Sequence, residues 1–328
     1  MRILHTLNWV QFAGTEKVCV DLCNEFSKEH DVFLLSNKNI KSYISNKVNL
    51  IEVDFNKSRN NPIFLYQIYK IIKKINPDVI HIHNTKELEV MYNARYFLLK
   101  KTPILGTKHT LTPKKKFALA DLAVGILEDT HSIIDATNTM IIKNGMAYKK
   151  PNPVKKEDKF HIISAARLTP AKGMDIIIKS LSLVEFDYKF SIFGQGEQEE
   201  ELQKLIVDLD LEEKIEIIGF VDNLNDYLAS ADVQIIASIF EPYGLTAIDG
   251  IYYSNVLLSS NTGICADILE KELIFENTPQ SLAIKLNEVF SDYIYYLNLF
   301  QKTKDKKEEF SIEKMAQKYL DAYKSIIK

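Results

Sequence analysis

The sequence predicts an α/β protein made of two doubly wound parallel sheets. Short apolar runs alternate with longer amphipathic segments, which is typical of parallel strands joined by crossover helices. The alternation occurs twice and is interrupted at residues 148–158, where YKKPNPVKKED has the proline and lysine content of a linker. A chain of 328 residues, of which 46% are hydrophobic, is long and apolar enough for two ordinary globular domains.

Each half divides into strands and helices by the period of its apolar residues. In the first half, strands are predicted at residues 2–7, 31–36, 78–83, 103–109, 122–127 and 140–145, and helices at 14–30 and 64–76. In the second half, strands are predicted at 160–166, 189–196, 214–220, 232–238 and 255–261, and helices at 173–184, 197–210, 224–231 and 244–254. The tail from Phe310 has a helical pattern. We therefore expect domains at 1–150 and 151–310, followed by a C-terminal helix at 311–328.

Composition limits the classes of function. No stretch approaches the ~18 apolar residues of a spanning helix, and the first ten residues do not have the pattern of a signal peptide. Three cysteines, an odd number, favour a reducing compartment, so a cytoplasmic location is expected. The net charge is −3, but residues 1–150 hold 22 Lys+Arg and 14 Asp+Glu (+8), whereas residues 151–328 hold 19 and 30 (−11). The basic first half, with clusters such as Lys114–Lys116, predicts an anionic partner, either a membrane surface or an anionic acceptor, although solvated helix ends and loops explain each cluster by itself. The lack of a nucleic-acid motif argues against nucleic acid.

The loops after predicted strands carry the candidate binding residues, because ligands of open parallel sheets lie beyond the carboxyl ends of the strands. Arg167 and Lys172 follow one strand, and two cations in such a loop suit a diphosphate, with solvated loop charges as the alternative. Gly14 would let backbone N–H groups approach an anion, although the start of a helix alone explains a single glycine. Gly194 likewise allows close backbone approach to a ligand, or simply makes a tight turn.

The stretch SIFEPYGLTAIDG contains two acids eight positions apart, Glu241 and Asp249. Glu241 follows a predicted strand and can accept hydrogen bonds from sugar hydroxyls, while the N–H groups of Gly244 and Leu245 can face a phosphate. Asp249 lies within two turns of the helix start, within reach of a ribose hydroxyl. Complementing the helix dipole is the alternative for both acids.

Several other side chains have two explanations. Phe220 and Val221 lie just past a strand, where they could hold a flat base or belong to the core and a turn. Cys19 and Cys23 have a spacing that could bind a metal, but no His or acid partner is evident, so buried thiols are favoured. The only tryptophan, Trp9, could stack on an acceptor sugar or pack in the fold.

In their order, these motifs resemble the retaining GT-B glycosyltransferases of family 4. The second half contains ARLTPAKGMDIIIKSL, FSIFGQGEQEEEL, IEIIGFVDNLNDYLASADVQIIASIFEPYGLTAIDG and SSNTGICADIL, and the first half contains FAGTEKVCVDLCNEF, PDVIHIHN, GTKHT and IIKNGM. The closing FSIEKMAQKYLDAYKSII resembles the helix that crosses back to the first domain. The resemblance implies two Rossmann-like domains facing a central cleft, the first binding the acceptor and the second the nucleotide-sugar donor.

The resemblance also implies roles for individual residues. Arg167 and Lys172 would hold the donor diphosphate, and Glu241 matches the first acid of the family's E-x7-E motif. Asp249 replaces the second Glu, which holds the ribose, and His109 in GTKHT matches a histidine near the reacting sugar. The other donor-binding residues implied are Gly14, Gly194, Phe220, Val221, Tyr243, Gly244 and Leu245. Trp9, His83 and Lys108 are candidates for contact with the acceptor, with a buried core imidazole as the alternative for His83.

The expected function is that of a retaining hexosyltransferase. It would move a hexose or N-acetylhexosamine from a nucleotide sugar, with uracil as the expected base and guanine as the alternative, to a glycan or lipid-linked glycan of a bacterial-type surface polysaccharide or lipopolysaccharide. Because cations would stabilise the leaving diphosphate, no metal or other cofactor is expected. Peripheral contact of the first domain with the cytoplasmic face of the inner membrane is also expected. A GT-B sugar-nucleotide 2-epimerase and a non-catalytic nucleotide-sugar binding protein are the alternatives.

Overall fold

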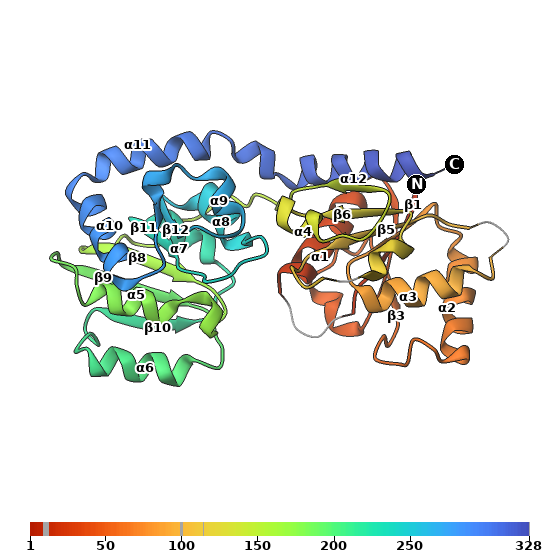
Figure 1. Cartoon of the computed structure of the whole chain (residues 1–328), viewed down its shortest axis with the longest axis horizontal. Coiled ribbons are helices and arrows are strands. Elements are labelled where there is room, and N and C mark those ends of the chain that lie inside the picture. The colour runs from red at the N-terminus through yellow and green to blue at the C-terminus, as the bar shows by residue number, and fades with distance from the viewer. Residues whose placement is uncertain (9–12, 99–100, 114, 328) are drawn as a thin grey trace. The chain divides into compact units, whose positions relative to one another are not determined.

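The computed structural model describes residues 1–8, 13–98, 101–113 and 115–327. These divide into two compact units. The N-terminal unit contains Met1–Ala147 together with Glu309–Lys328, and the C-terminal unit contains Tyr148–Glu308. In each unit, helices cover a parallel sheet on both faces (Figure 1). Two doubly wound α/β units are the predicted fold class, which is confirmed.

The sheet of the N-terminal unit has the strand order β3-β2-β1-β4-β5-β6-β7, and all its pairs are parallel. Its strands are β1 (Arg2–Thr6), β2 (Asp31–Ser36), β3 (Asn49–Glu52), β4 (Val79–Ile82), β5 (Ile104–Lys108), β6 (Leu122–Gly125) and β7 (Thr139–Ile141). Its helices are α1 (Gly14–Phe26), α2 (Pro62–Ile75), α3 (Thr85–Arg95), α4 (Glu128–Ser132) and α12 (Ile312–Ile326), with short 3-10 turns η1 (Lys38–Ser42) and η2 (Lys115–Leu119).

Local sequence sets where the helix α2 begins and ends. The side chain of Asn61 accepts hydrogen bonds from the N–H groups of Ile63 and Phe64, and Pro62 is the first helical residue. The helix stops at Asn76, whose φ of 49° is left-handed, directly before Pro77. Its buried face packs on the sheet together with α3.

Side chains that alternate along β1 and β4 pack differently on the two faces of the sheet. Leu4, Ile80 and Ile82 point into the apolar core under α2 and α3. The alternate residues His5 and His81 are fully buried on the other face, which α1 and α12 cover. The sheet is therefore apolar on one face and carries imidazoles on the other.

The C-terminal helix α12 is fastened to the N-terminal unit by two buried tyrosines. The hydroxyl of Tyr323 lies 2.7 Å from Nδ1 of His81, and that of Tyr319 lies 3.0 Å from Oγ1 of Thr107. The Thr107 hydroxyl is in turn 2.8 Å from Nε2 of His81. Since both phenols are buried with partners, these contacts select one register of the helix on the sheet.

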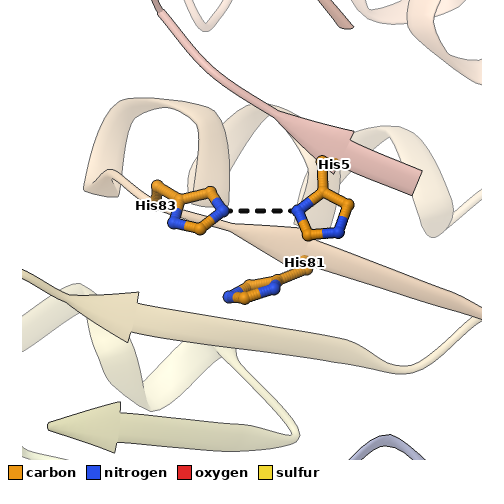
Figure 2. Close-up of side chains that lie close together, drawn as sticks. All are labelled: His5, His81 and His83. Carbon is orange, nitrogen blue, oxygen red and sulfur yellow. Dashed lines mark hydrogen bonds between the residues drawn. The ribbon is translucent and has the colours of Figure 1, made fainter. Parts of the chain in front are cut away.

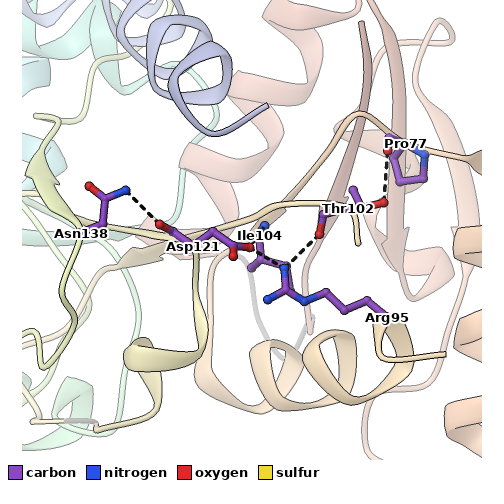
Figure 3. A network of polar contacts seen from close by, with 6 residues as sticks. All are labelled: Pro77, Arg95, Thr102, Ile104, Asp121 and Asn138. Carbon is purple, nitrogen blue, oxygen red and sulfur yellow. Dashed lines mark hydrogen bonds and ion pairs between the residues drawn. The ribbon is translucent and has the colours of Figure 1, made fainter. Parts of the chain in front are cut away.

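A second polar network joins α3 to the residues at the start of β5 and directly before β6 (Figure 3). The buried guanidinium of Arg95 pairs with Asp121 and donates to the carbonyl of Thr102 at 3.0 Å. The same carboxylate accepts a hydrogen bond of 2.7 Å from the N–H of Ile104. Asn138 donates to the backbone carbonyl of Asp121 at 2.9 Å. Asp121, which stands before β6, is therefore bonded to α3, to β5 and to the segment before β7.

The sheet of the C-terminal unit has the order β10-β9-β8-β11-β12-β13, again all parallel. Its strands are β8 (Phe160–Ala165), β9 (Tyr188–Phe193), β10 (Ile215–Gly219), β11 (Val233–Ile236), β12 (Val256–Ser260) and β13 (Ile274–Phe275). Its helices are α5 (Met174–Leu181), α6 (Glu199–Asp208), α7 (Leu224–Ser230), α8 (Leu245–Tyr253), α9 (Gly263–Ile268), α10 (Pro279–Ser291) and α11 (Tyr293–Lys304), and its 3-10 turns are η3 (Pro170–Lys172), η4 (Lys271–Leu273) and η5 (Lys307–Phe310), which runs into the N-terminal unit.

The sequence prediction missed some elements and lengthened others. The strand β3 and the helices α3, α10 and α11 were not predicted, and the expected helix at 14–30 ends at Phe26. The helix α3 has a low mean hydropathy and only a weak amphipathic pattern, because buried Glu87 and Arg95 interrupt its apolar face. In the described part of the chain, no helix has the length and hydropathy needed to cross a membrane.

Candidate active site

The sheet of the C-terminal unit reverses its strand order between β8 and β11, which are neighbours in the sheet. In doubly wound sheets, ligands bind at the carboxyl ends of the strands at such a switch point. The loops after these two strands contain Arg167, Lys172 and Glu241. The structure therefore places three sequence-predicted residues at the position where this fold binds ligands.

Backbone contacts that only glycine permits hold these loops together. The N–H of Ile239 donates to the carbonyl of Ala171 at 2.9 Å. Gly173 has a φ of 64°, and a Cβ atom there would lie 2.1 Å from the carbonyl oxygen of Ala237. The loop that carries Lys172 is consequently pressed against the loop that carries Glu241.

Lys172 and Glu241 form an ion pair at this junction. Their side chains are only 23% and 15% exposed, so water screens the pair less than it would at the surface. The N–H of Glu241 donates to Oγ1 of Thr262 at 3.0 Å, which links the loop to the one after β12. Arg167 is exposed and pairs with no carboxylate among the residues that the structure describes. An ordered ammonium, a carboxylate and an available guanidinium can bind a phosphorylated, hydroxyl-bearing ligand.

The helix α8 begins directly after this pair. Gly244 has a φ of 93°, and the buried residue Tyr243 accepts a hydrogen bond at its carbonyl from the N–H of Ile264 at 2.7 Å. From Leu245 the helix presents N–H groups that have no acceptor within the helix, which makes its start favourable for an anion. Asp249 lies in the second turn; burial, and then the charge of Asp249, raise the pKa of Tyr253 one turn further on.

Three other predicted donor residues lie in the loops after β9 and β10. Gly194 has a φ of 131°, and a Cβ atom there would lie 1.9 Å from the carbonyl oxygen of Ala166. Its close backbone approach is thus to the loop of Arg167, which explains this glycine without a ligand. Phe220 is 69% exposed and Val221 is half-buried, so the alternative that Phe220 belongs to the core is wrong.

In the N-terminal unit, histidines from three neighbouring strands form a row. Nδ1 of His5 lies 3.4 Å from Nε2 of His83, and Nδ1 of His83 lies 3.1 Å from Nε2 of His109. Figure 2 shows His5 and His83 joined across the strands, with His81 packed beside them. Burial lowers the pKa of His5 to about 3 and that of His109 to about 4, and it also lowers the pKa of His81 and His83 well below the ordinary value. All four imidazoles are therefore neutral near pH 7, and each ring can donate one hydrogen bond and accept one.

This geometry changes the interpretation of two candidates for acceptor contact. His83 is 3% exposed and both its nitrogens have partners, so it orders His109 rather than facing a ligand. Lys108 is buried, donates to the carbonyl of Thr112 at 2.6 Å and lies over the ring of Phe117. It stabilises the loop after β5 from inside. Gly14 is the exposed first residue of α1, and Trp9 lies outside the described residues.

A buried carboxyl group, Glu87, was missed by the sequence prediction. It accepts hydrogen bonds from the N–H of Asn8, from Oγ1 of Thr6 at 3.2 Å and from the amide of Asn84 at 3.0 Å. Burial raises its pKa to about 8. Asn84 is the N-cap of α3 and Glu87 stands three residues later, so the spacing of a capping box was the available signal.

The expectation that Cys19 and Cys23 lack a histidine partner is wrong. The two thiols and one ring nitrogen of His5 lie within 4.8 Å of one another, all buried. The partner, His5, lies on β1, the strand that precedes α1, and the fold brings its ring beside the two thiols. The prediction that the thiols serve packing, and that no metal is needed, stays a prediction.

Two doubly wound parallel units with loops at the carboxyl ends of their strands have the architecture of the GT-B fold class. Family comparison agrees: the profile of Glycosyl transferases group 1 matches residues 147–308, and that of Glycosyltransferase Family 4 matches residues 12–137. The chain therefore belongs to the glycosyltransferase family that these two profiles describe, with the first profile matching its C-terminal unit and the second its N-terminal unit.

Individual relatives agree with this assignment. The chain is 30% identical over 156 residues to the N-acetylgalactosamine-N,N'-diacetylbacillosaminyl-diphospho-undecaprenol 4-alpha-N-acetylgalactosaminyltransferase of Campylobacter jejuni, covering 48% of this chain and 40% of the relative. It is 29% identical over 173 residues to the O-antigen biosynthesis glycosyltransferase WbnH of Escherichia coli, covering 52% and 48%. The chain thus spans less than half the length of either relative. The solved structure of Anabaena Alr3699/HepE in complex with UDP and glucose has the same fold, with a TM-score of 0.83 at 16% identity over 99% of this chain and 100% of that one.

Proposed function

We propose that this protein is a retaining glycosyltransferase that moves a hexose or N-acetylhexosamine from a UDP-sugar to a glycan or lipid-linked glycan acceptor. The observation that carries the proposal is the Lys172–Glu241 ion pair at the switch point of the C-terminal sheet. The UDP and glucose bound to HepE, and the glycan products named for the bacterial relatives, support the donor and the pathway of surface-glycan synthesis.

The chemical step requires stabilisation of charge on the departing nucleoside diphosphate. Arg167 and Lys172 supply positive charge, and the start of α8 supplies N–H groups from Gly244 and Leu245. Lys172 and the start of α8 are held before the reaction by the loop contacts described above, so little reorganisation of these groups would accompany leaving-group departure. The acceptor hydroxyl would attack on the face that the diphosphate leaves, with a phosphate oxygen taking its proton, which retains the anomeric configuration.

The other residues position the donor. Glu241 would accept hydrogen bonds from the hydroxyls of the transferred sugar, and Asp249 from the ribose, with a reach one methylene shorter than that of glutamate. Exposed Phe220 and the neighbouring backbone of Val221 would face the base. Neutral His109, in the N-terminal unit, would donate or accept a hydrogen bond near the reacting sugar rather than supply a charge.

The protein would work at the cytoplasmic face of the inner membrane and would require no metal, since cationic side chains take the role of a Lewis acid. Incubation with a panel of UDP- and GDP-sugars and a lipid-linked acceptor tests this. Transfer with retention, monitored by NMR of the anomeric proton and undiminished by a chelator, is expected. Epimerisation of the donor, or binding of a nucleotide sugar without turnover, would instead establish one of the two alternatives.

A further inference from the structure

A pocket of about 520 Å³ in the N-terminal unit is lined by cations and hydroxyls. The residues with polar side chains that line it are Ser58, Arg59, Thr85, Lys86, Lys115 and Lys116. No carboxylate is among its described lining residues. A pocket of about 390 Å³ in the C-terminal unit is different, because Lys179 there faces Asp175 and Glu201 also lines the wall. Of these two pockets, only the one in the N-terminal unit is lined by charges of a single sign.

One partly buried acid, Glu89, forms ion pairs with two of the cations. Arg59 pairs with Glu89 at 2.6 Å, and Lys116 pairs with the other oxygen of the same carboxylate. Desolvation, and then the charge of nearby Arg59, lower the pKa of Lys116. Lys86 and Lys115 form no ion pair with any residue that the structure describes. Four cations and one ion-paired acid give the pocket an excess of positive charge, which favours an anionic ligand.

The pocket lies where ligands of this fold bind. Its walls come from the segments that follow β3, β4 and β5 at the carboxyl edge of the sheet: a loop, the first turn of α3, and the loop that leads into η2. His83 and His109 follow two of these same strands. Thr85 is the first residue of the eleven-residue helix α3, so the helix start adds its positive end to the cations.

We propose that this pocket binds a phosphate or diphosphate group of the acceptor. The inference rests on the proposed function, since it takes the N-terminal unit to bind the acceptor. Arg59 and Lys116 form the ordered wall, and Lys86 and Lys115 close on the phosphate oxygens with the hydroxyls of Ser58 and Thr85. The acceptor is then a glycan linked through phosphate, and an uncharged glycan of the same sugars would bind weakly.

A concave site favours one phosphate group over a membrane surface. Contact with a flat layer of lipid headgroups requires cations spread over an exposed face, whereas these side chains converge from three loops on one volume. Headgroup binding is nevertheless a distinct outcome of the experiment below.

The test measures binding of inorganic pyrophosphate to the full-length protein by calorimetry. The variant R167A/K172A is the starting point, because it removes the diphosphate site proposed for the donor. In that background we expect one pyrophosphate site whose affinity falls with added salt. Adding K86A/K115A should weaken it by at least about 10-fold, as expected for the loss of two charge-assisted contacts. The matched control K38A/K41A removes two exposed lysines of the same unit that lie outside the pocket, and it should leave binding unchanged.

Three results would overturn the proposal. The first is that R167A/K172A binds no pyrophosphate, and the second is that K38A/K41A weakens binding as much as K86A/K115A does. The third is that K86A/K115A abolishes capture by vesicles containing phosphatidylglycerol while pyrophosphate binding persists, which would make the pocket a headgroup site. Binding of UDP by the otherwise native K86A/K115A protein separates the two claims. If even the native protein fails to bind UDP, the proposed function fails. If UDP binding is intact but K86A/K115A leaves the affinity for pyrophosphate unchanged, only the pocket is rejected.

Discussion

The N-terminal and C-terminal units have the same pattern of strand order but different chemistry where their strands end. In the C-terminal unit, glycines press the loops together, and a single ion pair, Lys172–Glu241, occupies the junction. In the N-terminal unit, neutral histidines and buried Glu87 lie at that edge, next to a basic pocket. The C-terminal unit holds a charged pair in place before a ligand arrives, whereas the N-terminal unit keeps four histidines uncharged beside a basic pocket.

This contrast predicts that turnover depends most strongly on the fixed charges of the C-terminal unit. The variant R167A/K172A should lower kcat/KM for a nucleotide sugar by about 10³-fold or more, because preorganised groups at a developing anion are worth that much. K179A, which removes an exposed lysine paired with Asp175 on α5, is the matched control and should retain activity. Undiminished turnover in R167A/K172A, or loss of native activity in chelator, would refute the assignment of these cations.

The second prediction concerns the glycine contacts that hold the loops of the C-terminal unit. G173A should destabilise this unit by about 3 kcal/mol, since it combines a left-handed φ with a Cβ 2.1 Å from a carbonyl oxygen. G219A has a similar φ of 87° but meets nothing closer than 3.9 Å, so about 1 kcal/mol is expected. Urea unfolding of both variants separates the steric contribution from the backbone contribution. Equal costs would mean that the loops are not held by this contact.

The N-terminal unit depends instead on buried polar networks, of which Arg95–Asp121 is the most connected (Figure 3). D121A should cost about 2 kcal/mol, because it leaves a buried guanidinium and the N–H of Ile104 without their acceptor. The carboxylate is 43% exposed, so the larger penalty of a fully buried pair does not apply. Removal of an exposed pair by K28A should cost less than about 0.5 kcal/mol. Urea unfolding followed by hydrogen exchange in α3 would locate the loss, and a D121A cost as small as that of K28A would contradict the account.

Acid should destabilise the N-terminal unit more than the C-terminal one. The pKa values of His5, His81, His83 and His109 are all lowered from 6.5 in the folded state, so only the unfolded chain gains these protons as the pH falls below 6.5. Glu87 has the opposite sign: its pKa is raised from 4.5 to about 8, so its contribution is lost as the pH rises through that range. Four histidines are opposed by one carboxyl group. The free energy of unfolding of the N-terminal unit should therefore fall by at least about 1 kcal/mol per pH unit below pH 6.5.

The comparison within the molecule provides the control for this pH dependence. The C-terminal unit has one histidine, His161, whose pKa is also lowered by burial. Hydrogen exchange at pH 7.0 and pH 5.5 should therefore show β4 and β5 losing protection before β8 and β9. E87Q should steepen the dependence of the N-terminal unit, because it removes the opposing group. Equal loss of protection in both units would contradict the assignment of neutral histidines.

The sequence was more informative about the C-terminal unit than about the N-terminal one. Arg167, Lys172 and Glu241 were found because each stands in a loop directly after an apolar strand, and contiguous motifs record local geometry. The contacts of Glu87 on α3 with Thr6 and Asn8, and of His5 on β1 with two cysteines of α1, form only when separate elements pack together. Apart from the capping-box spacing of Asn84 and Glu87, such contacts leave no local pattern. The basic pocket has the same origin, because its cations come from three separate loops and seemed to be ordinary surface charges in the sequence.

The smallest effect expected from the comparison is on membrane association. Residues 1–150 carry a formal charge of +8 and residues 151–328 carry −11, so attraction to an acidic membrane should come from the first part alone. Exposed charges are screened over about 10 Å at 0.1 M salt, and binding to vesicles containing phosphatidylglycerol should weaken several-fold between 50 and 200 mM salt. Vesicles of phosphatidylcholine alone are the control and should not bind the protein at either concentration. Binding that is indifferent to salt would show that apolar insertion, and not the basic unit, holds the protein at the membrane.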